Sequence, residues 1–370
     1  MQTDKNIRIV LVCGSYPPAR CGIGDYSSFL CEAIAKAGAD VSVITSSYLS
    51  IPQSSAPVKV LPLIKDWNLK YAGNILKQIL NQSPDIVQFQ YPNLEYKKNL
   101  SFNFLPGMLK KASPSIKIVE TFHEPLRDLK FLGKMRMLIN ISRADGFIFV
   151  EKENYASLPF YYKILIGSKP LSTIPIGSNV PVCERDPNFK RKLFNDFKIT
   201  GDLKLIMTFG FITQVKGYEL LLDTYNPEKE VWVHLGLKDK KEPYYEHFLS
   251  LAKEKGLLDH IYFTGELSAQ TIGTYLASSD VCVFPFKEGT TPRHGTFLAA
   301  AAQGSYIVAS HSVKRGYTEK ENIYYVTPND REALRTAIAF KPTTEKASIP
   351  LVPSWDTIAA SHIKLYSDLL

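Results

Sequence analysis

The chain has 370 residues, of which 45% are hydrophobic and 22% are charged, the composition of a folded globular protein. It holds no uncharged apolar run of the ~18 or more residues that a membrane-spanning helix needs, and its start lacks the segments of a signal peptide. Five cysteines without CxxC or CxxH spacing argue against a disulfide framework or a zinc site, so we expect a reducing, cytoplasmic location.

The net charge of +8 is unevenly distributed. Residues 1–180 contain 21 Lys and Arg against 13 Asp and Glu, whereas residues 181–370 contain 23 of each. The excess therefore lies in the first half, which can face phosphates or an anionic membrane surface. A scattered, solvated surface is the alternative.

The first half alternates β-rich apolar runs with helical stretches. Expected strands are Ile7–Cys13, Val41–Thr45, Asp85–Gln90, Ile116–Thr121 and Phe147–Val150, and expected helices include Tyr26–Lys36 and Leu69–Leu80. Alternation with near-continuous apolar strands predicts a parallel sheet covered on both faces.

The second half repeats this alternation after the turn cluster "STIPIGSNVPV". Expected strands are Leu203–Phe209, Val231–Leu235, Ile261–Thr264, Val281–Pro285, Tyr306–Ala309 and Ile323–Val326, and expected helices are Lys216–Leu222, Tyr244–Glu254, Ala269–Ala277 and Arg331–Phe340.

A chain of this length exceeds one ordinary core, and the repeated alternation predicts two doubly wound α/β domains in tandem. We place them at residues 1–180 and 181–350, with residues 351–370 forming a C-terminal helix that packs back on the first domain. Ligands of such sheets bind beyond the carboxyl ends of the strands, so we expect a site in a cleft between the domains.

The first strand-to-helix junction is "GSYPPARCGIGDYSSFLCEAI". Gly22, Ile23 and Gly24 are expected to form a loop ahead of a helix that starts near residues 25–27. Glycines allow backbone to approach a ligand and leave N–H groups free at a helix N-terminus. The spacing is not the dinucleotide fingerprint GxGxxG, and tight-turn geometry is the alternative.

A second junction, "KIVETFHEPLRD", places His123 and Glu124 directly after an expected strand. Titratable side chains at the carboxyl edge of a sheet are candidates for catalysis or polar binding. The alternative is a histidine that caps the next helix or pairs with Glu124.

The third junction, "IMTFGFITQVKGYELLLD", has Gly210 at a turn and Lys216 at the expected start of a helix. A lysine there conflicts with the helix dipole, and a bound anion would remove the conflict. A surface lysine without function is the alternative.

The fourth junction is "FPFKEGTTPRHGTFLAAAAQGSYIVAS". We expect Gly295 and Thr296 to start a helix whose alanines let its N-terminus approach a ligand closely. With Arg293 and His294 as candidate cations, this N-terminus can hold a diphosphate. Glu288 in the same loop can accept hydrogen bonds from sugar hydroxyls.

These segments together resemble the retaining glycosyltransferases of family four. The segments "DIVQFQYP", "IPIG" and "FTGEL" add to the resemblance, and all occur in the family's order over almost the whole chain. The resemblance implies a GT-B fold, with two Rossmann-like domains facing across a cleft. It also implies transfer of a sugar from a nucleoside diphosphate sugar to a hydroxyl of a glycan or lipid-linked glycan, with retained configuration.

The resemblance implies roles for single residues as well. His123 would contact the transferred sugar, and Glu288 matches the first carboxylate of the family's Glu-x7-Glu motif, so both are candidate catalytic residues. Lys216 would hold the diphosphate. The remaining donor-side candidates are Gly22, Ile23, Gly24, Gly210, Arg293, His294, Gly295 and Thr296, and the acceptor-side candidates are Asp25, Tyr26 and Glu124.

The sequence departs from the family pattern in two places. Ala299 or Thr296, depending on the alignment, stands where the motif's second glutamate belongs, and Gly210 is followed by Phe211 instead of arginine. Arg293 can replace that missing cation. "RHGT" resembles the Arg-Arg-Gly-Ser/Thr of a subgroup that lacks the second glutamate.

Two other functions stay open. A nucleotide-sugar 2-epimerase on this fold would need several carboxylates at the edge of the first sheet, where Asp25 and Glu124 are few. A non-catalytic scaffold subunit would explain the missing glutamate. For the transferase we expect no metal, no cofactor beyond the nucleotide sugar and no nucleic-acid partner, while the sugar, base, acceptor and oligomeric state are unspecified.

Basic and apolar residues mix within residues 96–143. "LRDLKFLGKMRMLINISR" and "EYKKNLSFNFLPGMLKK" interleave cations with large apolar side chains. Such segments can lie on an anionic bilayer, which would make the protein peripheral at the inner membrane face. The alternative is that these helices bury their apolar faces in the core.

Overall fold

The computed structural model describes residues 6–19, 21–47, 57–92, 95, 99–126, 129–236, 243–349 and 351–370. The chain forms two compact units: Met1–Gly177 with Pro353–Leu370, and Ser178–Val352. The chain therefore passes from the first unit to the second after Gly177 and returns to the first after Val352.

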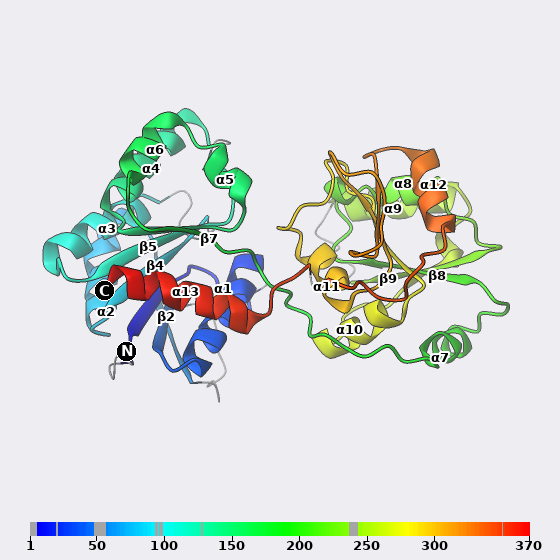
Figure 1. Ribbon diagram of the computed structural model, residues 1–370, viewed down its shortest axis with the longest axis horizontal. Coiled ribbons are helices and arrows are strands. Elements are labelled where there is room, and N and C mark those ends of the chain that lie inside the picture. Colours follow the sequence, from blue (N-terminus) through cyan, green and yellow to red (C-terminus); the bar gives the residue numbers. More distant parts are fainter. Residues whose placement is uncertain are drawn as a thin grey trace. The chain divides into compact units, whose positions relative to one another are not determined.

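The described part of the first unit contains a seven-stranded sheet in the order β3-β2-β1-β4-β5-β6-β7 (Figure 1). Every neighbouring pair is parallel. The strands are β1 (Arg8–Val12), β2 (Asp40–Ser46), β3 (Val58–Ile64), β4 (Ile86–Tyr91), β5 (Lys117–Phe122), β6 (Gly146–Phe149) and β7 (Leu171–Thr173). All strands predicted for this half are confirmed. The additional strand β3 lies at a sheet edge and is only partly buried, so its apolar pattern is weak.

Helices cover both faces of this sheet. The helices are α1 (Gly22–Lys36), α2 (Ala72–Leu80), α3 (Ser101–Ala112), α4 (Phe131–Arg143), α5 (Lys152–Ala156), α6 (Phe160–Ile166) and α13 (Trp355–Leu369). Side chains of α2, α3, α4 and α6 share one apolar cluster, and those of α1 and α13 share another. The C-terminal helix α13 packs against α1 within this unit, as Figure 1 shows.

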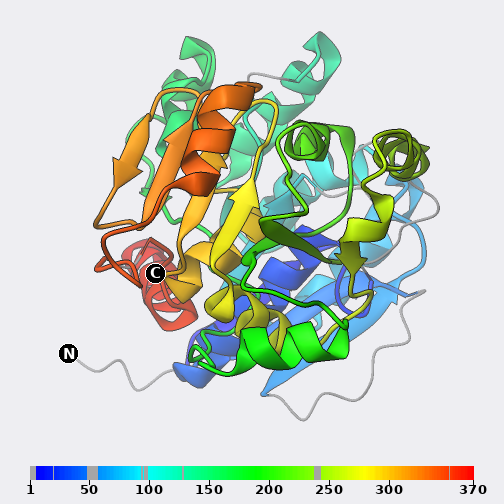
Figure 2. The same ribbon diagram turned by 90° about the vertical axis from the view of Figure 1, so that its right-hand side faces the viewer.

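The second unit also has a seven-stranded sheet within its described residues, in the order β10-β9-β8-β11-β12-β14-β13. Its strands are β8 (Lys204–Phe209), β9 (Glu230–Leu235), β10 (Ile261–Phe263), β11 (Val281–Phe284), β12 (Ile307–Ser310), β13 (Gly316–Thr318) and β14 (Ile323–Val326). Figure 2 turns this unit toward the viewer and shows its yellow and orange strands among helices. Among these strands only β13 runs antiparallel to its neighbour, and its partial burial at the sheet edge leaves too weak an apolar pattern to predict.

The helices of this unit are α7 (Phe189–Asp196), α8 (Tyr218–Leu222), α9 (Pro243–Glu254), α10 (Ala269–Ser278), α11 (Gly295–Gln303) and α12 (Arg331–Ala339). Side chains of α8, α9 and α12 pack into one apolar cluster with the strands, while α10 and α11 pack on each other below the sheet in Figure 1. The predicted class, two Rossmann-like doubly wound α/β units, is confirmed. None of the helices in the described ranges combines the length and apolar character that crossing a bilayer requires.

Each sheet has one place where successive crossovers leave in opposite directions. In the first sheet it lies between β1 and β4, and in the second between β8 and β11. The loops that follow two such strands diverge and leave room for a ligand at the carboxyl edge. Functional side chains are therefore expected on the loops after these four strands.

Candidate functional site

In the second unit, the loops after β8 and β11 meet through side chains. Lys216 lies at the end of the first loop, and its Nζ donates a hydrogen bond to Thr296 Oγ1 at 3.1 Å. Thr296 is the second residue of α11. The structure thus brings two of the predicted donor-binding residues together beside the divergence between β8 and β11.

Lys216 does not open a helix, contrary to the sequence-based prediction. It ends a 3-10 turn, Gln214–Lys216, and α8 begins two residues later after Gly217, whose backbone is left-handed. The ammonium instead lies 3.9 Å from the ring centroid of Phe286. Burial lowers the pKa of Lys216 to about 8. A desolvated ammonium at the start of α11, the positive end of that helix, would be stabilised by an anion.

Gly210 and Gly217 allow these two loops to approach each other closely. Both have positive φ, 112° and 65°. A Cβ on Gly210 would lie 2.7 Å from Thr296 Cγ2, and one on Gly217 would lie 2.2 Å from the carbonyl oxygen of Pro285. Neither position accepts a larger residue without movement of the opposite loop, so the glycines shape the site by the absence of a side chain.

Helix α11 begins at Gly295, which confirms its predicted start, and ends before Gly304. Its first turn is closed by a hydrogen bond from the Leu298 N–H to the carbonyl of His294, at 3.0 Å. The N–H groups of the three residues before Leu298 therefore point out of the helix end, as helix geometry requires. The buried residues Ala299, Ala300 and Ala301 let the helix pack closely on its neighbours.

His294 is not a second cation, which corrects the sequence-based interpretation. Its Nδ1 accepts a hydrogen bond from the Thr291 N–H at 2.9 Å, and its ring meets Phe286 edge-on with centroids 4.7 Å apart. Burial, together with the charges of Lys216 and Arg293, lowers the pKa of His294 to about 4. The ring is thus neutral near pH 7 and can donate only through Nε2. Arg293 is partly buried.

Glu288 lies in the loop between β11 and α11, and its side chain is exposed. The next residue, Gly289, has a φ of 88° and donates its N–H to the carbonyl of Phe286 at 3.0 Å. This tight turn presents the Glu288 carboxylate to solvent, available to hydroxyl donors.

A buried hydrogen-bond chain behind Gly210 was not predicted. Trp232 Nε1 donates to Thr208 Oγ1 at 2.8 Å, and Thr208 lies 2.8 Å from His234 Nδ1. His234 Nε2 lies 2.9 Å from the carbonyl oxygen of Gly210, which can only accept. His234 therefore carries its proton on Nε2, and Thr208 donates to Nδ1. Burial lowers the pKa of His234 to about 4, so the chain holds Gly210 with a neutral ring.

In the first unit, His123 follows β5 directly. Its backbone N–H donates to the carbonyl of Tyr91 at 2.8 Å, and its Nε2 donates to Gln90 Oε1 at 2.7 Å. Burial and the nearby His362 lower the pKa of His123 to about 3. His123 is therefore a neutral imidazole of fixed orientation at the edge of the sheet, and Glu124 beside it is exposed.

Helix α1 begins at Gly22, not near residues 25–27 as predicted. The Asp25 N–H donates to the carbonyl of Cys21 at 2.9 Å, which closes the first turn around Gly22, Ile23 and Gly24. A Cβ on Gly24 would lie 2.9 Å from the carbonyl oxygen of Ser15. These residues are thus the first turn of a helix packed on the loop after β1, not a free loop. Low helix propensity of glycine is why the pattern suggested a later start.

Tyr26, an acceptor-side candidate, is buried. Its ring lies edge-on to His123 with centroids 4.7 Å apart, and its hydroxyl lies 3.3 Å from His362 Nε2. His362 Nδ1 bonds to the carbonyl of Ile358, so its Nε2 accepts from Tyr26. Tyr26 therefore supports His123 from beneath instead of facing an acceptor. Burial raises the pKa of its neighbour Asp25.

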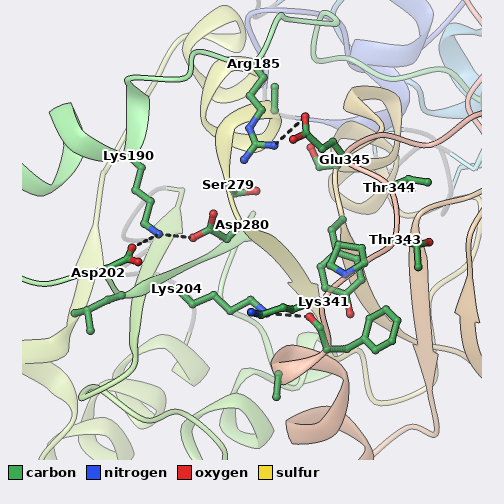
Figure 3. A pocket seen from close by; sticks show the side chains of 17 residues that line it. Arg185, Lys190, Asp202, Lys204, Ser279, Asp280, Lys341, Thr343, Thr344 and Glu345 are labelled. Carbon is green, nitrogen blue, oxygen red and sulfur yellow. Dashed lines mark hydrogen bonds and ion pairs between the residues drawn. The ribbon is translucent and has the colours of Figure 1, made fainter.

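A cavity of about 480 Å³ lies at the opposite, amino edge of the second sheet (Figure 3). Two of its lysines already have partners: Lys190 lies between Asp202 and Asp280, at 3.4 and 2.9 Å, and Lys204 donates to the carbonyl of Phe340 at 3.1 Å. None of the candidate donor residues lines it. The described residues also contain no group of three or more His, Cys, Asp or Glu placed to hold a metal ion.

Comparison with known proteins agrees with this fold. Residues 204–340 match the family model described as glycosyl transferases group 1, and this range contains Gly210, Lys216, Glu288 and α11. No curated protein sequence matches the chain significantly.

Solved glycosyltransferase structures are similar over nearly the full length. Sucrose-phosphate synthase from Thermosynechococcus elongatus has a TM-score of 0.73 and 17% identity, covering 98% of this chain and 99% of that chain. Anabaena HepE in complex with UDP and glucose has a TM-score of 0.68 and 15% identity, covering 98% of each chain. The catalytic domain of starch synthase IV from Arabidopsis thaliana, bound to ADP and acarbose, has a TM-score of 0.65 and 13% identity, covering 99% of each chain. The chain thus has the GT-B fold, and the fold and family match together support a glycosyltransferase.

Proposed function

We propose that the protein transfers a sugar from a nucleoside diphosphate sugar to a hydroxyl group of a glycan or lipid-linked glycan. One observation carries the proposal: the Lys216 ammonium meets Thr296 at the N-terminus of α11, at the carboxyl edge between β8 and β11. A cation and free backbone N–H groups converge there, which is the chemistry that binds a diphosphate.

The donor diphosphate would lie across the start of α11. Lys216 and Arg293 supply positive charge, the N–H groups of Gly295 and Thr296 supply directional hydrogen bonds, and neutral His294 can add a donor through Nε2. Because the leaving diphosphate gains negative charge as the sugar departs, these groups stabilise the transition state more than the bound donor. We propose that this suffices without a metal ion or a further cofactor.

We propose that His123 and Glu288 each act on the transferred sugar. A neutral imidazole of fixed orientation can exchange hydrogen bonds with a sugar hydroxyl, and an exposed carboxylate can accept from two hydroxyls. On the acceptor side we retain Asp25 and Glu124. Retention of the anomeric configuration is proposed from the resemblance to retaining enzymes, and NMR coupling constants of the product's anomeric proton would test it.

UDP-sugars and ADP-sugars are the first donors to test, because the HepE structure contains UDP and the starch synthase structure contains ADP. We propose action on the cytoplasmic side, in polysaccharide or glycan synthesis.

The deciding experiment incubates purified protein with labelled UDP-, ADP- and GDP-sugars, with and without glycan acceptors. Transfer of label, absent in Lys216→Ala and Arg293→Ala, is expected. Interconversion of the nucleotide sugar without an acceptor would instead show an epimerase. A protein whose melting temperature no nucleoside diphosphate raises would be a non-catalytic subunit.

A further inference from the structure

The outer faces of α4 and α6 in the first unit carry large apolar side chains in solvent. Phe131 and Leu132 are each 74% exposed and Met135 is 49% exposed, all on α4. Phe160 and Ile164 on α6 are 74% and 70% exposed. No other pair of packed helices among the described residues presents apolar side chains this exposed.

The two helices form one layer on the sheet. They pack against each other, and the Tyr162 hydroxyl of α6 donates to the carbonyl of Lys134 in α4 at 2.8 Å. Their inner faces contribute Met137, Ile141 and Ile166 to the same apolar cluster. In Figure 1 both lie on the outside of the unit, above the sheet. The alternative for this stretch was that its apolar side chains are buried in the core. Burial accounts for the inner-face side chains but not for the apolar side chains of the outer face.

The charged side chains on α4 and α6 themselves are all basic. Neither residues 129–143 nor residues 154–170 contain an Asp or Glu, while Lys130, Lys134 and Lys163 accompany the apolar side chains. Along the chain, the flanking carboxylates are Asp128 and Asp145 on either side of residues 129–143, and Glu153 directly before residue 154. Exposed aromatic and aliphatic side chains among lysines match a surface that is apolar inside and anionic outside.

We propose that this outer face of α4 and α6, the α4–α6 face, docks on an anionic lipid bilayer. The apolar side chains enter the boundary between headgroups and acyl chains, and the lysines lie among anionic headgroups. The inference rests on the proposed function for its purpose, which is to deliver the enzyme to a lipid-linked acceptor. The docking itself requires no catalysis.

The α4–α6 face includes only part of the predicted segment 96–143. Lys110 pairs with Asp145 at 2.6 Å, and the Arg136 side chain turns inward to Asn103 Oδ1 at 3.1 Å. Phe102 is 2% exposed. Tyr96, Lys97, Lys98 and Arg127 lie outside the described residues. Docking therefore belongs to the start of α4, which lies within the predicted segment, and to α6, which lies outside it.

Vesicle flotation of the full-length protein tests the proposal. Vesicles of phosphatidylcholine alone are compared with vesicles containing 30% phosphatidylglycerol, a composition of about one anionic lipid in three. Wild type is expected to float with the anionic vesicles, less so as salt rises. Phe131→Ser with Leu132→Ser, and separately Phe160→Ser with Ile164→Ser, should each lower the partition coefficient by about tenfold or more.

Two controls match these variants. Val313→Ser removes an apolar side chain that is 79% exposed in the second unit, and it should leave flotation unchanged. Lys130→Gln with Lys134→Gln should weaken binding, whereas Lys36→Gln with Lys77→Gln, which removes two exposed lysines elsewhere in the first unit, should not.

Each other outcome overturns the docking proposal. Wild type that fails to float, or variants that all float like wild type, would do so. Equal losses in the face and control lysine variants would show adsorption by overall charge. A dimer in sedimentation velocity that the serine variants dissociate would assign the face to a second copy of the chain. Donor binding, measured on the same variants by thermal shift with UDP and ADP, separates these failures from failure of the proposed function.

Discussion

The ammonium of Lys216 and the hydroxyl of Thr296, 80 positions apart in the sequence, lie 3.1 Å from each other at the start of α11. The contact joins the loop after β8 to the loop after β11, and it sets a cation beside backbone N–H groups that have no partner within the helix. The donor-site predictions follow from this contact.

Replacing Lys216 with Ala should weaken nucleoside diphosphate binding by about 1.5–3 kcal/mol, or roughly 10- to 150-fold, because a hydrogen bond to a charged group is lost. Arg293→Ala should behave similarly. Calorimetric titration with UDP and ADP measures the affinity, and circular dichroism checks folding. Lys346→Ala, at an exposed position of the same unit, is the matched control. Unchanged affinity in both site variants would disprove the diphosphate assignment.

Donor affinity should fall as pH rises through about 8. Burial lowers the pKa of Lys216 to about 8 in the free protein, so its ammonium is charged below that pH and is lost above it. Bound anion favours the charged form and raises the pKa, so binding takes up a proton near this pH, with affinity decreasing up to about tenfold per pH unit above it. Titrations between pH 7 and 9 measure this. Lys216→Arg should flatten the dependence of affinity on pH. If the slope of affinity against pH stays the same in this variant, the titrating group is another residue.

His123→Gln and Glu288→Gln should reduce turnover while leaving nucleoside diphosphate affinity nearly intact, because the hydrogen bonds that these variants remove or weaken are those to the sugar. Since burial lowers the pKa of His123 to about 3, this residue should add no ionisation step to the rate between pH 5 and 9. Steady-state kinetics with the nucleotide sugar that supports transfer, and calorimetry with the matching nucleoside diphosphate, provide the two readouts. A nucleotide affinity that falls as far as turnover would contradict the assigned roles.

Thr208→Val should weaken donor binding although Thr208 lies behind the site. The substitution removes the hydroxyl that donates to His234 Nδ1. The imidazole then lacks one hydrogen bond and holds the Gly210 carbonyl less firmly, and the free energy of unfolding should fall by about 1–3 kcal/mol. His234→Gln can keep the bond to the Gly210 carbonyl and should retain more affinity than His234→Ala. Thermal unfolding and UDP or ADP titration are measured together. If all three variants lose stability but keep their affinity for UDP or ADP, the hydrogen bonds from Thr208 through His234 to Gly210 serve folding alone.

Glu120→Gln should stabilise the protein at neutral and alkaline pH. Glu120 is fully buried on β5, accepts from Asn140 Nδ2 at 2.9 Å, and has its pKa raised to about 8 by burial. A carboxyl whose folded pKa exceeds its unfolded value favours folding fully at low pH, and this contribution is lost as pH rises from about 4.5 through 8.

Glutamine imitates the protonated form at every pH. The gain over wild type should therefore grow between pH 5 and 8 by roughly 3–4 kcal/mol. Urea unfolding at several pH values measures it. A gain that stays constant over this range would mean that Glu120 does not titrate there.

The strands and the doubly wound class follow from local sequence. Runs such as Leu203–Phe209 and Val281–Pro285 are apolar because both faces of a central parallel strand are buried, and that requirement is visible in neighbouring residues. The start of α11 was also predictable from neighbouring residues, since Gly295 and the alanines after it are a local signal. Edge strands β3 and β13 were missed because partial burial leaves a weak pattern.

The sequence by itself thus determined the order of the elements and the loops that carry candidate chemistry, because periodicity and turn residues act over a few positions. Only the tertiary structure decided the state of each side chain. It put Lys216 against Thr296, made His294 neutral, buried Tyr26 beneath His123, and placed His234 behind Gly210. Burial and charge at a residue depend on partners dozens of positions away, and their identity is set by how the strands pair.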